Sequence, residues 1–519
     1  MDKRKYKHPV AVIEIGSNNI KMRVAQADKL TGGIKDLDIL ETPIALGHEV
    51  FSTGKVTFDT LKEISARLKG FSKLMSEYGI ANYRVVATSA LRSAVNRSYV
   101  VDQLRIQTGM KVDILEDSQE KALIYDTVLR LLNKTAEHSV ENALLSYIGT
   151  GSIGIAHCIH GKIEYSQNIN LGSLRLGDML RELENETDDP FPSVEEYMEN
   201  TLGLVSEEFA QGIGSLFVTG TDTESIALLC GGQDDNGIYQ IRKKDLHSLY
   251  KSIRTLSTET IALQYNLSYD EAEILYAGVA IYCKLAEFTQ AEIITAPQIK
   301  LSDALLHQML TPADAKAYAV HIRTNALACA DRIAQHYHSD IKHCQTAATL
   351  SCIIFDRMKK IHGLTSHERL LLELAAKLHD CGYYVNSRNH HLSSYYLIKN
   401  SAIYGLTEGE ISLIAQITQY SETHIPTTGT PGFFTMSEQQ RLMVSKLAAI
   451  LRMANAMDKS HKSKVNEIKV KLTDDKITIT AISDQSLYLE KWAFKECAPF
   501  FQEVFGITPE LVIKTLLLK

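Results

Sequence analysis

The stretch Val10-Ala-Val-Ile-Glu-Ile-Gly-Ser-Asn-Asn-Ile-Lys-Met-Arg-Val-Ala25 contains the pattern from which an architecture can be inferred. Residues 10–15 are almost wholly apolar, which predicts a buried strand. Residues 16–19 are typical of a turn, and residues 20–25 alternate apolar and polar side chains as a return strand does. The stretch therefore predicts a strand, a polar glycine turn and a second strand.

The same plan recurs further along the chain. Residues 143–148 read as a strand, Gly149-Thr-Gly-Ser152 as a turn and residues 153–158 as a return strand, and 133 residues separate Gly16 from Gly149. That interval is about the size of one domain. The recurrence predicts two similar lobes with polar turns facing each other across a cleft. Glycine allows close approach, and successive backbone N–H groups suit phosphate. The alternative is a pair of ordinary β-hairpins.

Composition limits the classes of function. A net charge of −7 gives no global attraction to nucleic acid, so we expect no nucleic-acid partner. No run of about 18 uncharged apolar residues is present, and residues 10–15 read as a strand, so we expect neither a membrane span nor a signal peptide but a cytoplasmic protein. The eight cysteines form no Cys-x-x-Cys pair, which favours buried free thiols.

Further motifs follow the first turn in order. They are Ala87-Thr-Ser-Ala-Leu-Arg-Ser-Ala-Val-Asn96, Glu116-Asp-Ser-Gln-Glu-Lys-Ala-Leu-Ile-Tyr125, the second turn, Leu171-Gly-Ser-Leu-Arg-Leu176, Gly220-Thr221, Leu378-His-Asp-Cys-Gly-Tyr-Tyr384 and His390-His-Leu-Ser-Ser-Tyr-Tyr-Leu-Ile398. This ordered set resembles the exopolyphosphatase and guanosine-pentaphosphate phosphohydrolase family over nearly the whole chain. The resemblance implies an α/β fold, a duplicated actin-like (ribonuclease H-like) two-lobed module followed by an all-helical HD-type domain.

The resemblance also implies the domain boundaries. We expect lobe I over residues 1–135, lobe II over 136–310, the HD-type domain over 311–462 and a small C-terminal α/β subdomain over 463–519. In that last part, residues 467–472 and 476–481 around Thr473-Asp-Asp475 read as a β-hairpin.

The activity implied is release of terminal phosphate from inorganic polyphosphate, or of the 5′-phosphate of guanosine pentaphosphate, with Mg²⁺. Such chemistry needs a cation on the phosphate oxygens and a carboxylate that orients or deprotonates water. Glu120 matches the catalytic glutamate of the family, and Glu14 is the expected Mg²⁺ ligand. The alternative for Glu120 is a solvated helix residue. Arg92 is expected to bind phosphate, and the alternative for this residue is a surface salt bridge. The expected phosphate-binding residues are Gly16, Ser17, Asn18, Asn19, Arg92, Gly149, Thr150, Gly151, Ser152, Gly220 and Thr221.

The chain also departs from the family. Glu14 stands where an aspartate usually precedes the first turn. Tyr147 and Gly154 stand where an aspartate and a glutamate usually flank the second turn, and the segment Lys300-Leu-Ser-Asp-Ala-Leu-Leu306 lacks the family arginine. The loss of two carboxylates predicts weak metal binding in the cleft and slow turnover.

A second constellation lies in the helical part. His343, His379, Asp380 and Asp458 follow the order of HD-type metal phosphohydrolases, and each falls on an apolar helical stripe. Imidazole and carboxylate ligands suit Mn²⁺, Fe²⁺ or Zn²⁺, and a metal would relieve the cost of a buried carboxylate. The alternative is a structural remnant in which His379 and Asp380 cap a helix end.

Three hypotheses of function therefore stand. The first is an exopolyphosphatase-like hydrolase that uses Glu120, and we favour it. The second is a regulatory protein that binds polyphosphate or a guanosine penta- or tetraphosphate without efficient hydrolysis. The third is an HD-type nucleotide phosphohydrolase with the lobes as its sensor; an actin-like kinase is more distant, because such kinases lack the HD portion. A homodimer is one oligomeric state that the sequence allows.

Overall fold

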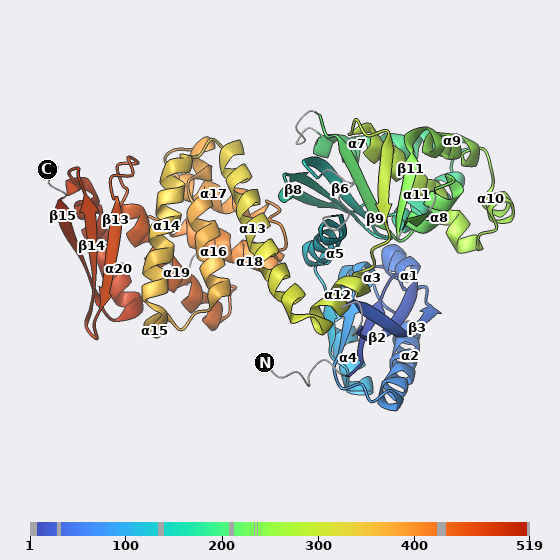
Figure 1. The fold of residues 1–519 in the computed structure, drawn as a ribbon, viewed down its shortest axis with the longest axis horizontal. Coiled ribbons are helices and arrows are strands. Elements are labelled where there is room, and N and C mark those ends of the chain that lie inside the picture. The colour runs from blue at the N-terminus through green and yellow to red at the C-terminus, as the bar shows by residue number, and fades with distance from the viewer. Residues whose placement is uncertain are drawn as a thin grey trace. The chain divides into compact units, whose positions relative to one another are not determined.

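The computed structural model describes residues 8–28, 33–132, 140–206, 212–232, 234–235, 237–422 and 432–515. The chain divides into two compact units, residues 1–322 and residues 323–519. Unit 1 contains two α/β lobes, and unit 2 contains a group of helices and a small sheet (Figure 1).

Lobe I is built on a five-stranded sheet of order β3-β2-β1-β4-β5. The first three strands are antiparallel neighbours, and β4 and β5 run parallel to β1. Alternation along β1 places Ala11 and Ile13 on one face and Val10 and Val12 on the other, in separate apolar cores. The elements are β1 (Val10–Ile15), β2 (Asn19–Ala27), β3 (Ile34–Pro43), α1 (Leu46–Thr53), α2 (Phe58–Glu77), β4 (Tyr83–Ala87), α3 (Ser89–Ser93), α4 (Arg97–Thr108), β5 (Val112–Ile114) and α5 (Asp117–Leu132).

Lobe II repeats this plan in a seven-stranded sheet of order β10-β11-β12-β9-β6-β7-β8. Strands β6, β7 and β8 are antiparallel neighbours, and β9 and β12 continue the sheet in parallel from β6, as β4 and β5 do from β1. The strands are β6 (Asn142–Ile148), β7 (Ile153–Ile159), β8 (Lys162–Ile169), β9 (Ser215–Gly220), β10 (Asp234–Asp235), β11 (Ile238–Arg242) and β12 (Ile293–Pro297). The helices are α6 (Ser173–Glu184), α7 (Phe191–Ser206), α8 (Thr223–Leu229), α9 (Lys243–Ile253), α10 (Thr258–Tyr265) and α11 (Tyr269–Glu287).

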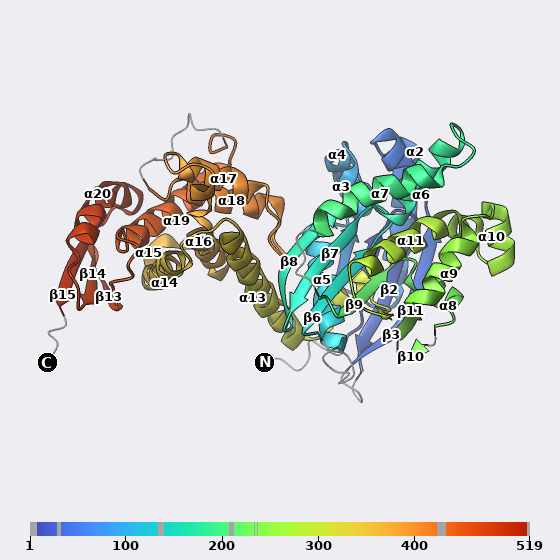
Figure 2. The same ribbon diagram turned by 90° about the horizontal axis from the view of Figure 1, so that it is seen from above.

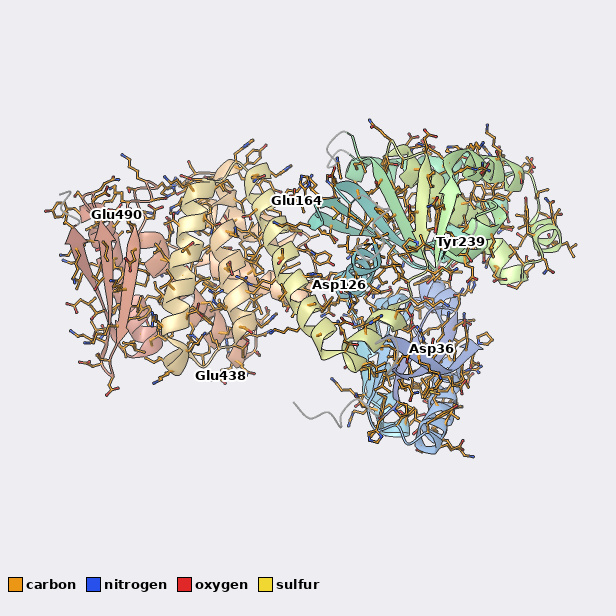
Figure 3. All side chains as sticks on the ribbon, viewed as in Figure 1. Asp36, Asp126, Glu164, Tyr239, Glu438 and Glu490 are labelled. Carbon is orange, nitrogen blue, oxygen red and sulfur yellow. The ribbon has the colours of Figure 1, made fainter. Side chains whose placement is uncertain are left out.

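Helix α12 (Leu301–Leu310) follows lobe II in the sequence but packs on lobe I. Its apolar residues, among them Leu305 and Leu306, share a core with Val10 and Val12 of β1 and with Leu123 of α5. Arg23 of β2 donates to Asp36 of β3 at 2.7 Å and also pairs with Asp303 of α12, so charge reinforces the same contact. Figure 3 labels Asp36 and, on α5, Asp126.

Unit 2 is helical up to a small sheet. A hairpin of β13 and β14 is extended by β15, parallel to β14, and α20 packs against β15 and α19 (Figure 2). The predicted hairpin over residues 467–481 is thus confirmed. The elements are α13 (Pro312–His336), which begins in unit 1, α14 (Ile341–Arg357), α15 (Lys359–His362), α16 (Ser366–Leu378), η1 (Cys381–Tyr384), α17 (His390–Lys399), α18 (Glu408–Gln419), α19 (Glu438–Ala456), β13 (Glu467–Leu472), β14 (Lys476–Ser483), α20 (Tyr488–Phe505) and β15 (Thr508–Thr515).

Within the described ranges, no helix is both long and apolar enough to span a bilayer.

Candidate functional site

The two glycine turns are built alike. Gly16 donates its backbone N–H to the carbonyl of Asn19 at 2.9 Å, and Gly149 donates to the carbonyl of Ser152 at 2.9 Å. Each turn joins the first two antiparallel strands of its lobe. Asn18 has a buried side-chain oxygen without a hydrogen-bond partner, so this turn keeps an unused acceptor.

Ser89, the first residue of α3, lies beside both turns. The hydroxyl oxygen of Ser17, in the first turn, lies 3.0 Å from the hydroxyl oxygen of Ser89. A Cβ atom added to Gly151 of the second turn would lie 3.0 Å from Cβ of the same Ser89. Gly47 of lobe I is equally tight, because its added Cβ would lie 2.8 Å from Leu174 of lobe II. The turns are therefore close neighbours where the lobes meet.

Arg92 and Glu120 are direct partners beside these turns. Arg92 donates to Glu120 at 2.9 Å, to Asp117 at 2.6 Å and to the carbonyl of Leu115 at 2.7 Å. Glu120 is only 5% exposed, so it is not the solvated helix residue considered above. Arg92 does form a salt bridge, but this salt bridge is mostly buried, and its partner is Glu120, the expected catalytic residue. We call Ser17, Ser89, Arg92, Glu120 and Ser152 the interlobe site.

Lys121, one residue after Glu120, ties helix α5 to the second turn. Its ammonium donates to the Ser152 hydroxyl at 2.6 Å and also pairs with Asp117. Its side chain is 2% exposed. Although burial alone would raise the pKa of Asp117, the charges of Lys121 and Arg92 hold it below the ordinary value.

The two departures from the family face each other across neighbouring strands. Tyr147 of β6 pairs with Gly154 of β7. A Cβ atom on Gly154 would lie 2.4 Å from Cγ of Lys121 and 2.5 Å from the hydroxyl oxygen of Tyr125. The space that a larger residue at position 154 would need is thus filled by helix α5. Burial raises the pKa of Tyr147 well above its usual range, so the phenol stays neutral.

Glu14 occupies the face of β1 that is turned to α5. It follows Val10 and Val12 in the two-residue alternation of the strand, and these pack with Leu123 of α5. Burial, followed by the nearby charge of Glu120, raises the pKa of Glu14 to about 7. Glu14 is therefore an electrostatic neighbour of Glu120.

The remaining expected phosphate residues lie at the same edge of the lobe II sheet. Gly220 is in register with Ile148 at the ends of parallel strands β9 and β6, and Thr221 donates its N–H to the Ile148 carbonyl at 3.2 Å. The Thr150 carbonyl accepts from Leu174 at 3.1 Å. A Cβ on Gly172 would lie 2.2 Å from that carbonyl oxygen, which explains the glycine there.

Unit 2 gathers the second constellation. Ligand atoms of His343, His379 and Asp380 all lie within 4.8 Å of one another, and all three residues are buried. His379 uses Nδ1 in a 2.8 Å hydrogen bond with the Ala376 carbonyl. His343 Nε2, His379 Nε2 and Asp380 Oδ2 are buried without a hydrogen-bond partner. Buried polar atoms of this kind usually have a partner, so three together need one.

Asp458 supports this group and does not join it. One carboxylate oxygen lies 2.9 Å from Nδ1 of His343, and the other accepts the Ser463 N–H at 2.7 Å. The helical-stripe prediction also needs correction. Helix α19 ends at Ala456, before Asp458, and His379 is the cap residue that ends α16. The chain turns just past the helices, and these turns bring the side chains together.

A cavity of about 400 Å³ opens beside the group in unit 2. It is lined by Asp380 together with His338, Ser339, Asp340, Tyr383 and His461. The ring of His461 stacks on His343 with centroids 3.6 Å apart. Asp380 is therefore shared between the buried group and a space open to a small molecule.

Sequence reasoning missed three residues of the sites. Ser89, Asp117 and Lys121 all lie within the motifs that carry the resemblance, but none was expected to have a role. The spacing of Asp117 and Lys121, four residues apart on one helix, was an available signal for an ion pair. No signal in the sequence linked that pair to Gly154, because the contact joins different lobes.

Comparison with known proteins identifies the family of the chain. Residues 24–311 match the Ppx/GppA phosphatase family, and residues 323–496 match domain III of Ppx/GppA phosphatases. A guanosine-5′-triphosphate,3′-diphosphate pyrophosphatase from Pseudoalteromonas translucida (strain TAC 125) is 20% identical over 461 residues, 86% of each chain. The crystal structure of the Aquifex aeolicus Ppx/GppA family member is 18% identical, with a TM-score of 0.50, and covers 59% of this chain and 98% of its own. An exopolyphosphatase from Cytophaga hutchinsonii ATCC 33406 is 16% identical, with a TM-score of 0.51, and covers 59% and 98%.

The fold of unit 1 and its paired turns define a two-lobed α/β protein, as in these solved structures. The chain belongs to the Ppx/GppA phosphatase family. This membership confirms the expectation, drawn from the ordered motifs, of an enzyme that hydrolyses phosphoanhydride bonds.

Proposed function

We propose that the chain releases terminal phosphate from inorganic polyphosphate, or the 5′-phosphate of guanosine pentaphosphate, at the interlobe site. The observation that carries the proposal is the buried pair of Arg92 and Glu120, 2.9 Å apart, beside two glycine turns. A guanidinium can bind two phosphate oxygens, and a carboxylate next to it can orient or deprotonate the attacking water.

The division of labour follows from these positions. Backbone N–H groups and hydroxyls of the turns would hold the terminal phosphates, since glycine carries no Cβ of its own that would keep a phosphate from the backbone. Substrate binding to Arg92 would compete with its contact to Glu120 and free that carboxylate for water. Glu120 is then the proposed general base and Arg92 the proposed phosphate ligand.

The test is phosphate release from long-chain polyphosphate and from guanosine pentaphosphate, each with Mg²⁺, with Mn²⁺ and with chelator. Glu120→Gln keeps the size of the side chain and removes its basicity. We expect a loss of kcat of about 10²–10⁴-fold, the usual contribution of a general base. Glu182→Gln, at an exposed position of helix α6, is the matched control and should retain wild-type rates. An active Glu120→Gln enzyme would refute the assignment.

We propose a second function for unit 2, an HD-type metal centre held by His343, His379 and Asp380. The supporting observation is that three buried ligand atoms of these residues lie close together without a hydrogen-bond partner. Both imidazoles face the Asp380 carboxylate, with His343 Nε2 at 3.7 Å and His379 Nε2 at 3.4 Å. Asp458 and the Ala376 carbonyl fix the two rings at Nδ1 and leave Nε2 for a metal, as outer partners of ligating histidines do. Mn²⁺, Fe²⁺ or Zn²⁺ suits this donor set, and such an ion, when bound, activates water.

In that function, the chain's own residues would place a phosphate ester in the adjoining cavity. Tyr383 and His461 line it and offer stacking and hydrogen bonding to a small molecule. Metal content of the purified chain, measured by mass spectrometry, tests the centre. We expect His379→Ala, Asp380→Ala to lose the bound metal. His367→Gln, at a half-exposed histidine of α16 that pairs with Glu410, should keep it. Equal metal content in all three proteins would favour the structural remnant.

A further inference from the structure

The divalent cation implied by the family does not fit the interlobe site of this chain. Asp117 is already bound by Lys121, Arg92 and the Ser152 hydroxyl, and Glu120 is bound by Arg92. Tyr147 presents a neutral phenol where the family has a carboxylate. Among the described ranges of the chain, the one cluster of three or more ligating side chains is that of His343, His379 and Asp380 in unit 2.

Lys121 occupies the space that the departure at Gly154 leaves. The aliphatic stem of Lys121 passes the backbone of Gly154 so closely that an added Cβ would lie 2.4 Å from Cγ and 3.1 Å from Cε. The ammonium then ends between Asp117 and the Ser152 hydroxyl, 5.4 Å from the centre of the Tyr147 ring. Glycine at position 154 and lysine at position 121 therefore depend on each other.

The balance of charges around Lys121 also indicates that no divalent cation is needed there. Asp117 and Glu120 bring two carboxylates to Arg92, which carries one positive charge, and Glu14 is a third carboxyl group near Glu120. Without Lys121, that set would carry an excess of negative charge and attract a divalent cation, because buried charge needs a partner. With Lys121, the partner is part of the chain.

We propose that Lys121 takes the place of the divalent cation in the interlobe site, binding Asp117 and holding the Ser152 turn for phosphate. This inference deepens the proposed function, since it rests on phosphate binding at the same site. Lys121 is a positioning residue here, because it acts through Asp117 and Ser152. An ammonium carries one positive charge and cannot activate a bound water as a metal does, so hydrolysis would depend on Glu120.

The experiment measures Mn²⁺ binding by electron paramagnetic resonance, since Mn²⁺ reports on sites that take Mg²⁺. All proteins carry His379→Ala and Asp380→Ala, which removes the centre in unit 2. With Lys121 intact, we expect no stoichiometric Mn²⁺. Lys121→Met should gain about one bound Mn²⁺ per chain, because the carboxylates lose their internal cation. Lys62→Met, at an exposed lysine of α2, should gain none.

Two results would overturn the inference. One is stoichiometric Mn²⁺ in the chain with Lys121 intact that disappears in Glu120→Gln. The other is a Lys121→Met chain that binds no Mn²⁺ although hydrogen exchange shows its lobes folded. If Lys121→Met does not fold, the measurement on the chain with Lys121 intact decides alone. Phosphate release by the wild type is measured in parallel: a chain that follows the expected Mn²⁺ pattern but releases no phosphate contradicts only the proposed function.

Discussion

Gly154→Ala adds a single methyl group at the contact between the two lobes, and its cost can be worked out from the structure. The new Cβ would lie 2.4 Å from Cγ of Lys121 and 2.5 Å from the hydroxyl oxygen of Tyr125. Carbon atoms in contact normally lie about 3.5–4.0 Å apart, so one neighbour must move by more than 1 Å. Lys121 resists, because Asp117 and Ser152 hold its ammonium. We expect a cost of about 3 kcal/mol, the upper end of the usual range for overpacking.

A double-mutant cycle identifies the cause of that cost. Lys121→Ala removes the stem that the new methyl group meets, so Gly154→Ala should cost about 2 kcal/mol less in that background than in the wild type. Gly70→Ala is the control within the same unit. Gly70 lies on helix α2 with nothing within 4 Å of an added Cβ, so alanine there should stabilise slightly.

The assay must separate the two units. Trp492 is the single tryptophan and lies in α20, so tryptophan fluorescence follows unit 2 and should not change. Hydrogen exchange of peptides from α5 and β7, measured along a urea titration, follows unit 1. If Gly154→Ala is tolerated as well as Gly70→Ala, or if its cost is the same with and without the Lys121 side chain, the close packing described here is wrong.

Three further predictions concern stability and metal binding. The pKa of Glu14 is raised from 4.5 to about 7, so the charged form is disfavoured in the folded state. As the pH rises from about 4.5 through 7, unit 1 of the wild type should therefore lose up to about 3 kcal/mol of stability relative to Glu14→Gln in urea unfolding. Parallel pH profiles of the two proteins would contradict the burial of Glu14. Asp458→Asn weakens the acceptor that fixes His343 at Nδ1 and should lower metal affinity about 10–100-fold in a competition titration with a chelator, whereas unchanged affinity would remove Asp458 from the centre. Gly382→Ala places a Cβ 1.9 Å from the His390 carbonyl oxygen and 2.4 Å from the Ser394 nitrogen. The free energy of unfolding of unit 2, followed by Trp492 fluorescence, should therefore fall by more than about 3 kcal/mol. A variant as stable as the wild type would contradict this close approach of Gly382 to α17.

The sequence predicted the parts of the fold that rest on local pattern. Buried strands followed by glycine turns gave both hairpins, and their recurrence predicted two sheets that do share strand order and direction. Helix α12 shows the limit of such reasoning. Nothing local in residues 301–310 shows that this helix packs on lobe I after a full second lobe has intervened. Long-range docking depends on surfaces that the sequence does not display.

Local sequence pattern also predicted only part of the candidate sites. Glu120 and Arg92 were expected in one site from motifs that resemble the family, and the structure places them 2.9 Å apart. Asp458 was expected on a helix, but α19 ends before it, since helix ends are the least certain feature of a pattern. Turn geometry and not helical spacing sets where such a residue points.

The departures at Tyr147 and Gly154 can now be interpreted together. Taken singly, each is a lost carboxylate, and the pair predicted a weakened site. The structure shows that the two positions face each other in adjacent strands and that the side chain of Lys121 fills the space beside Gly154. In a Gly154→Glu variant, the new side chain would therefore collide with the side chain of Lys121 before any metal could bind. Because buried charges are retained only with partners, the absence of acidic side chains at positions 147 and 154 and the presence of Lys121 belong to one charge balance. A gain of metal-dependent activity would need Tyr147→Asp and Gly154→Glu in a chain that also carries Lys121→Ala.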